Sequence, residues 1–177
     1  MICLSVFNHI VFDLDRTIWD TYDKYQNLIW AKQLIQPFQL INDDIITDDV
    51  GNRCVLRFGV RELLRALHNE KKRISFLSVG RIQNFPDYYQ PSLHVLDLFK
   101  ISEYFGKDSV LEYKTEKKSK HFPLDADLNS CVFLDDCDIH LADIAQLGVK
   151  CVLNTSKISN YKNLYAMNNT RDSHVIR

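Results

Sequence analysis

The sequence lacks an excess of charge of either sign. Of its 177 residues, 22 are Lys or Arg and 23 are Asp or Glu, which gives a formal net charge of −1. Proteins dedicated to binding nucleic acid or acidic lipid usually carry clustered basic residues, because they must neutralise phosphates. We therefore expect neither nucleic acid nor a membrane surface among the partners.

The sequence also lacks a long hydrophobic run and a paired-cysteine motif. The first apolar stretch, Val6–Phe12, is interrupted by Asn8 and His9, and no stretch approaches the length that crosses a bilayer. The five cysteines show no CxxC spacing, and Cys131 and Cys151 lie in strand-like apolar runs. Buried free thiols explain this pattern better than disulfides or zinc, so we expect a reducing, cytoplasmic location.

Internal repeats and low-complexity segments are absent as well. The composition, 46% hydrophobic and 25% charged, is that of an ordinary globular protein. A chain of this length can bury roughly two-thirds of its unfolded surface in one core. We expect a single domain over residues 1–177, with a frayed tail from about residue 165.

One short stretch near the N-terminus carries the first chemical motif. The apolar run that ends at Phe12 is followed by Asp13, Leu14, Asp15, Arg16 and Thr17. A continuous apolar run predicts a strand buried on both faces, which places Asp13 and Asp15 where that strand ends. Two neighbouring carboxylates repel each other unless a cation neutralises them, and oxygen ligands favour Mg²⁺. The stretch predicts a metal site.

Further strands and helices alternate along the rest of the chain. Apolar runs predict strands at residues 74–77, 110–113, 130–134 and 149–153, and helical spacing is found over residues 59–72, 93–100 and 139–147. This alternation predicts an α/β fold with a doubly wound parallel sheet. Residues 18–58 contain two β-prone runs separated by Asp- and Asn-rich turns, and we interpret them as a small flap or hairpin inserted after the first strand, with Trp19 and Tyr22 packing it.

Polar residues follow three of the predicted strands. Asp13 and Asp15 end the first strand, Ser78 ends the second, and Asp135 and Asp136 end the fourth. Right-handed crossovers bring the carboxyl ends of parallel strands to one edge, where ligands bind in such sheets. Lys118 precedes the fourth strand and is expected near the same edge, although Lys117 and Lys120 are close alternatives. His121 and His140 are interpreted as structural or exposed.

These motifs together resemble those of the haloacid-dehalogenase superfamily of phosphotransferases. Asp13-Leu-Asp15-Arg-Thr17 resembles the first motif, Ser78 the second, Lys118 the third and Phe133-Leu134-Asp135-Asp136 the fourth. The similarity covers about residues 7–153. The Thr-Ile-Trp continuation at 17–19 and the segment from Lys118 to Phe122 resemble more narrowly the small, nearly capless magnesium-dependent phosphatases, which implies a Rossmann-like core without a large cap.

The resemblance implies a two-step phosphoryl transfer. Asp13 would attack phosphorus to form an aspartyl-phosphate, and Asp15 would serve as general acid and then general base. Mg²⁺ would be held by Asp13, by the main-chain carbonyl of Asp15 and by Asp136.

Further residues would hold the phosphate and support the site. Ser78, Val79 and Lys118 would bind the phosphate, with Lys118 also orienting Asp13. Thr17 would fix the loop, and Asp135 would position Lys118. Arg16 stands where the superfamily usually has glycine, and Arg16 and Arg81 are possible substrate contacts.

The leading function is therefore a Mg²⁺-dependent phosphomonoesterase. The gaps between motifs leave no room for a sizeable cap, so an open site would suit phosphotyrosine-like, protein-linked or sugar-phosphate substrates, whether small molecules or phosphoproteins. A polynucleotide end phosphatase is the first alternative, which the near-neutral charge disfavours. A non-catalytic binding protein on the same fold is the second, although no motif acid is missing. The order of the acids does not fit a receiver domain.

Overall fold

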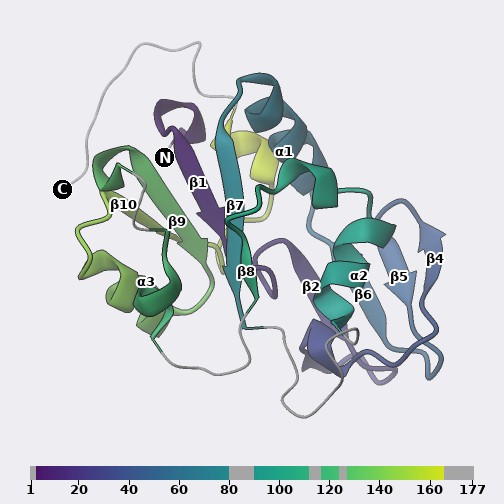
Figure 1. Cartoon of the computed structure of the whole chain (residues 1–177). Coiled ribbons are helices and arrows are strands. Elements are labelled where there is room, and N and C mark those ends of the chain that lie inside the picture. The colour runs from purple at the N-terminus through teal and green to yellow at the C-terminus, as the bar shows by residue number, and fades with distance from the viewer. Residues whose placement is uncertain (1–2, 80–89, 112–116, 124–126, 166–177) are drawn as a thin grey trace.

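The computed structural model describes residues 3–79, 90–111, 117–123 and 127–165 (Figure 1). Its central element is a five-stranded parallel sheet in the order β10-β9-β1-β7-β8. The strands are β1 (His9–Phe12), β7 (Arg73–Ser78), β8 (Val110–Leu111), β9 (Cys131–Asp135) and β10 (Cys151–Asn154). Each corresponds to a run that the sequence predicts as a strand. From β1 the chain winds outward through β7 to β8, then returns to the other side of β1 for β9 and β10.

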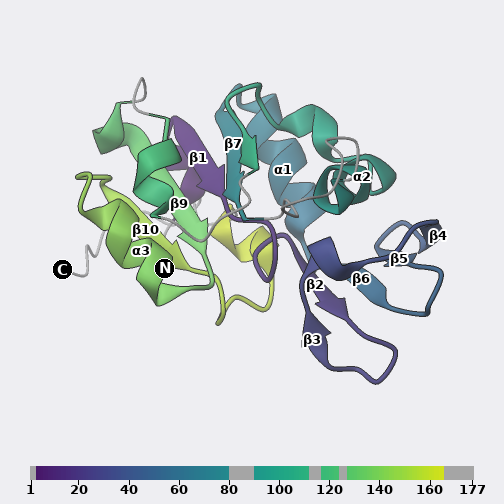
Figure 2. The same cartoon turned by 60° about the horizontal axis from the view of Figure 1, so that its bottom comes forward.

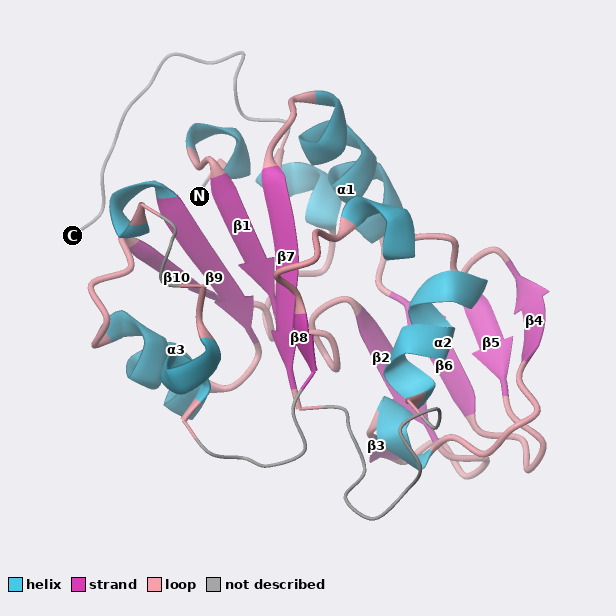
Figure 3. Ribbon diagram, in the orientation of Figure 1, coloured by secondary structure: helices cyan, strands magenta, loops and turns pink. Residues whose placement is uncertain are grey.

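Both faces of this sheet are covered by helices. Ile10 and Phe12 on one face of β1 belong to a core cluster that includes residues of α1 (Val60–Asn69) and α2 (Pro91–Leu98). Val11, which points to the other face, packs in a second cluster with Leu141 and Ile144 of α3 (Asp138–Ala145). Because successive side chains of a strand point to opposite faces, a fully apolar β1 requires this two-sided cover. Figure 3 shows α3 beside β9 and β10, and α1 beside β7.

The region expected to be a flap or hairpin is instead a second sheet. Five antiparallel strands pair in the order β3-β2-β6-β5-β4. They are β2 (Trp19–Tyr22), β3 (Leu28–Ile29), β4 (Gln39–Asn42), β5 (Ile45–Thr47) and β6 (Arg53–Leu56). The antiparallel sheet extends to one side of the parallel sheet (Figure 2). Its residues Trp19, Ile46 and Cys54 are fully buried in the same cluster as Ile10, so the two sheets share a core.

Short 3-10 helices complete the described chain. They are η1 (Leu4–Val6), η2 (Ala31–Gln33), η3 (Ser102–Tyr104), η4 (Lys118–His121), η5 (Leu128–Ser130) and η6 (Tyr161–Leu164). The η6 turn lies just before the tail expected to fray, and Tyr161 within it is fully buried. The tail beyond residue 165 lies outside the described residues. No helix in the described part of the chain is long and apolar enough to cross a bilayer.

Candidate active site

Asp13 and Asp15 lie directly beyond the carboxyl end of β1. The main-chain N–H of Asp13 still donates to Leu134 O of β9 at 2.8 Å, so the sheet itself fixes the position of this carboxylate. Asp15 Oδ1 accepts hydrogen bonds from Trp19 Nε1 (3.0 Å) and from the amide of Ala31 (2.9 Å). Its second oxygen, Oδ2, is buried and has no hydrogen-bond partner within the described structure. One oxygen of Asp15 is therefore anchored and the other is available for chemistry.

The turn after Asp15 is held by contacts from distant parts of the chain. Arg16 adopts a left-handed backbone conformation, with φ of 61°. Thr17 is fully buried, and its Oγ1 lies 2.9 Å from Thr155 Oγ1. The guanidinium of Arg57 donates to the carbonyls of Arg16 (2.6 Å) and Thr155 (3.1 Å). These contacts fix the backbone that follows the two acids.

Lys118 lies in the site, whereas the two alternatives, Lys117 and Lys120, do not. Its side chain is 2% exposed, and Nζ lies 2.7 Å from Asp13 Oδ1 and 2.6 Å from Asp135 Oδ2. Lys117 and Lys120 are exposed. The η4 turn is tied to α3 because the amide and hydroxyl of Ser119 both donate to the Asp143 carboxylate at 2.8 Å. This anchor places Lys118 between the two acids.

The two neighbouring acids after β9 have different surroundings. Asp135 is fully buried, and its Oδ2 contacts both Lys118 Nζ and His140 Nδ1 (3.1 Å), while its Oδ1 accepts from the amide of Cys137 at 2.8 Å. Asp136 is half-buried, and no other residue of the described chain donates a hydrogen bond to its carboxylate. Asp135 is thus occupied by protein donors, and Asp136 is open to a ligand.

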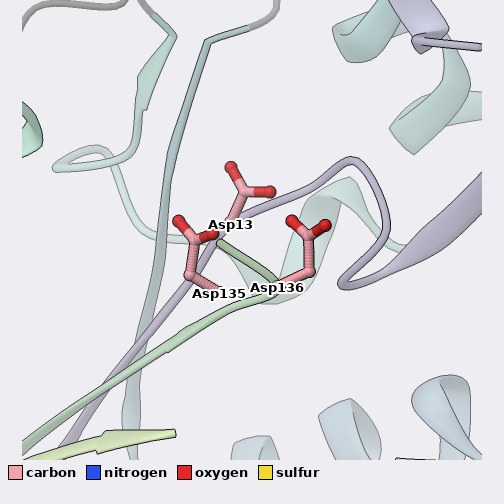
Figure 4. Close-up of side chains that lie close together, drawn as sticks. All are labelled: Asp13, Asp135 and Asp136. Carbon is pink, nitrogen blue, oxygen red and sulfur yellow. The ribbon is translucent and has the colours of Figure 1, made fainter. Parts of the chain in front are cut away.

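Three carboxylates at this edge fit a divalent cation. Oxygens of Asp13, Asp135 and Asp136 lie within 4.8 Å of one another (Figure 4). Such an all-oxygen set matches the preference of hard cations such as Mg²⁺. Since Asp135 is held by Lys118 and His140, Asp13 and Asp136 are the better direct ligands of the three. The site lies where the winding of the sheet reverses, between β1 and β9, which is the usual ligand position in open α/β sheets.

Burial and neighbouring charges shift the pKa values in opposite directions. Burial raises the pKa of Asp13 to about 7, although the Lys118 charge opposes this shift. Burial also raises the pKa of Asp15 and of Asp136. For Asp135, burial is outweighed by hydrogen bonds from His140 and Lys118, so its pKa is lowered. Burial would lower the pKa of Lys118, but the carboxylates of Asp13 and Asp135 raise it. Without a metal ion, burial therefore favours the protonated form of Asp13.

The predicted residues surround a cavity of about 350 Å³. Asp13, Asp15 and Asp136 line it together with Ser78 and Val79 from the end of β7. Further lining comes from residues that the sequence did not single out for the site or assigned elsewhere: Trp30, Lys32, Cys137 and His140. Arg16 lines the cavity as well, whereas Arg81 lies outside the described residues. The region of η2 and the start of α3 thus both contribute side chains to the cavity wall.

The local sequence gives little indication that His140 and Trp30 line the cavity. His140 follows Asp135 by five residues, and the two side chains meet because α3 begins at Asp138 between them. Trp30 directly precedes the η2 turn and Lys32 lies within it, and the amide of Ala31 between them donates to Asp15. Trp19 was expected to pack the inserted segment. Its indole N–H also donates to Asp15, which lies four residues earlier in the sequence.

Comparison with known proteins identifies the family and supports the fold. A family model described as acid phosphatase matches residues 5–163. A crystal structure of a "putative phosphatase" from Clostridium difficile superimposes with a TM-score of 0.57 at 13% sequence identity, and the match covers 88% of each chain. At that identity the structural match supports the fold alone. The family match covers nearly all of the described chain, and the chain therefore belongs to the haloacid-dehalogenase-like acid phosphatase family.

Proposed function

We propose that the protein hydrolyses phosphomonoesters in a Mg²⁺-dependent reaction that passes through a phosphorylated Asp13. The observation that carries the proposal is the Asp13 carboxylate, fixed at the end of β1, bonded to Lys118 and facing a cavity shared with Asp136. Phosphatase membership supports the reaction class. The nucleophile, the metal and the substrate are the parts that we add.

Asp13 is the proposed nucleophile. In the first step an Asp13 oxygen forms a bond to phosphorus while the bond from phosphorus to the leaving-group oxygen breaks. In the second step water attacks phosphorus, and the bond to Asp13 breaks to release inorganic phosphate. Lys118 contacts Oδ1 of Asp13 and orients the carboxylate for attack. The attacking group is thereby aimed by a side chain that is itself fixed between two acids.

Asp15 is the proposed general acid and base. Its raised pKa favours the protonated form needed to donate a proton to the leaving oxygen. The resulting carboxylate then accepts a proton from the attacking water. Because Oδ1 is held by Trp19 and Ala31, the proton is carried on Oδ2, which has no competing partner in the described structure.

Phosphate charge is met from two sides of the cavity. Ser78 and Val79 offer hydrogen bonds at the end of β7, and Lys118 contributes a positive charge. Asp13, Asp136 and the main-chain carbonyl of Asp15 are the proposed ligands of Mg²⁺. When bound, the ion offsets the repulsion between the Asp13 carboxylate and the phosphate oxygens. Asp135 positions Lys118 from behind.

The substrates proposed are phosphotyrosine-like, protein-linked or sugar phosphates, since these fit an open site. The overall charge of −1 disfavours a polynucleotide end phosphatase, because contacts with a nucleic-acid backbone need clustered basic residues.

The proposed function is tested with para-nitrophenyl phosphate. We expect turnover that requires Mg²⁺ and is abolished by Asp13→Asn, with Asp97→Asn as a control on the exposed side of α2. Turnover that survives Asp13→Asn would refute the nucleophile assignment. Full turnover in the presence of a chelator would refute the metal dependence.

A further inference from the structure

Two cations, Arg16 and Lys32, lie on the η2 side of the cavity. Arg16 and Lys32 both line the cavity, and within the described structure neither lies within ion-pair distance of a carboxylate. Lys118, by contrast, is balanced by Asp13 and Asp135. The charge of Arg16 and Lys32 is therefore available to a ligand.

The Arg16 side chain is held in place rather than extended into solvent. Its guanidinium carbon lies 4.2 Å from the centroid of the Trp30 ring, a stacking distance. Its Nε is buried and has no hydrogen-bond partner in the described part of the chain. A buried donor without a partner is costly unless a ligand satisfies it, and guanidinium groups bind carboxylates and phosphates through paired N–H donors.

The position of these cations relates them to the leaving group. Arg16 follows Asp15 directly in sequence, and Lys32 follows Ala31, whose amide binds Asp15. Arg16 and Lys32 line the same cavity as Asp15, the proposed proton donor, so a leaving group beside Asp15 comes near both cations. The phosphate itself is met by Ser78 and Lys118 at the strand ends.

We propose that Arg16 and Lys32, with Arg16 braced by Trp30, form a subsite for a second anionic group on the leaving group. This inference rests on the proposed function and narrows its substrate class to small phosphomonoesters that carry a carboxylate or a second phosphate. A cavity of about 350 Å³ is at the small end of ligand sites, which fits a second anion close to the ester oxygen.

A purely structural role for Arg16 is the competing explanation. Burial raises the pKa of Asp15, Asp20 and Asp136, and the Arg16 charge opposes that rise, so Arg16 could serve only to offset these acids. That role predicts the same loss of activity on every substrate when Arg16 is replaced. A subsite predicts a loss that depends on whether the substrate carries a second anion.

The test compares substrates that differ in one charge. The Mg²⁺-loaded protein is assayed with 4-carboxyphenyl phosphate and with 4-carbamoylphenyl phosphate, which has the same shape without the charge. We expect kcat/KM to favour the carboxylate by about tenfold, mostly through KM, and Arg16→Gln or Lys32→Gln to reduce that preference to less than about threefold. Arg65→Gln, on the exposed side of α1, is the matched control and should keep it. A parallel pair, glucose 1,6-bisphosphate against glucose 6-phosphate, distinguishes a second phosphate from a carboxylate.

A preference for neither second anion in the wild type, or one that Arg16→Gln leaves intact, would overturn the subsite. Calorimetric binding of the corresponding benzylphosphonates, which cannot be hydrolysed, to the Mg²⁺-loaded wild type separates this inference from the proposed function. Selective binding of the carboxylate without turnover by the wild type would contradict the function and support the subsite. Equal turnover and equal binding of both compounds would contradict the subsite alone.

Discussion

Lys118 Nζ lies 2.7 Å from Asp13 Oδ1, although 105 residues separate the two in sequence. The same ammonium lies 2.6 Å from Asp135 Oδ2, so one buried cation joins the acids at the ends of two adjacent strands. Charge-assisted hydrogen bonds of this kind fix geometry as well as charge. The relative positions of β1, β9 and η4 therefore determine how the carboxylate of Asp13, the proposed nucleophile, is oriented.

Removing this cation should affect both stability and catalysis. We expect Lys118→Met to lower the free energy of unfolding by about 3 kcal/mol, because two buried carboxylates lose their partner. The rate on an aryl phosphate should fall by at least about 100-fold. Urea unfolding without Mg²⁺ and steady-state kinetics measure the two effects. Lys117→Met, at the exposed neighbouring position, should change neither, and a comparable loss there would contradict the assignment of Lys118.

The raised pKa of Asp13 predicts a specific dependence of stability on pH in the metal-free protein. The folded state retains this proton up to about pH 7, whereas the unfolded chain releases it near the ordinary aspartate pKa of 3.8. The unfolded state thus binds fewer protons in this window, so the contribution of Asp13 to stability decreases as pH rises from about 4 to about 7. Thermal unfolding of the wild type and Asp13→Asn, compared pH by pH, isolates this contribution from those of Asp135 and Lys118.

Mg²⁺ should reverse the loss of stability that Asp13 causes as the pH rises. A cation that binds only the ionised carboxylate should raise the melting temperature more at pH 8 than at pH 5. Asp13→Asn should lose most of that increment. An increment equal at the two pH values would show that the ion does not bind through Asp13.

Asp143 is predicted to act at a distance from the reacting atoms. It holds Ser119 through two hydrogen bonds, and Ser119 adjoins Lys118. We expect Asp143→Ala to lower kcat by about tenfold through misplacement of Lys118, with little change in KM. Asp143→Asn, which keeps one acceptor for Ser119, should restore part of the rate, and Gln146→Ala on the exposed surface should have no effect. An unchanged kcat in a folded Asp143→Ala protein would exclude this positioning role.

Two glycines with the same backbone conformation offer a matched pair for stability. Gly59 and Gly148 have φ of 83° and 84°. A Cβ at residue 59 would lie 2.8 Å from the main-chain nitrogen of Lys162, whereas a Cβ at residue 148 would meet nothing within 4 Å. Gly148→Ala should cost only the left-handed penalty, about 1 kcal/mol, and Gly59→Ala about 3 kcal/mol, because η6 must also move. Urea unfolding gives both values, and equal costs would show that η6 yields without strain.

The sequence predicts the parallel sheet well because its strands are buried on both faces. Val11 and Phe12, for example, face opposite cores and must both be apolar, so the run is unmistakable. The acids at the strand ends are predictable for the same reason, because each directly follows such an apolar run. The inserted sheet is harder to predict from the sequence, because β3 and β5 have only two and three residues and lie among Asp- and Asn-rich turns. Their pairing depends on partners distant in sequence.

The residues of the candidate site also divide into those that local sequence places and those that tertiary contacts place. Asp13, Asp15 and Asp136 could be predicted from their places after strands, whereas the choice of Lys118 over Lys117 depends on how η4 is oriented by Asp143. His140 could not be assigned, since its contact with Asp135 depends on the start of α3. Lys32 lies in a turn whose position is set by the inserted sheet. Side chains placed by tertiary contacts leave little local pattern.

The central position of β1 has a consequence for how the protein becomes active during synthesis. This strand is made first, yet its neighbours are β7 and β9, and Phe12 pairs with Phe76 and Leu134. Contacts so distant in sequence form late, because long loops must close before they contribute. The turn after Asp15 requires Thr155 and Tyr161, whose hydroxyls reach Thr17. We expect a ribosome-bound chain to remain inactive until η6 has emerged.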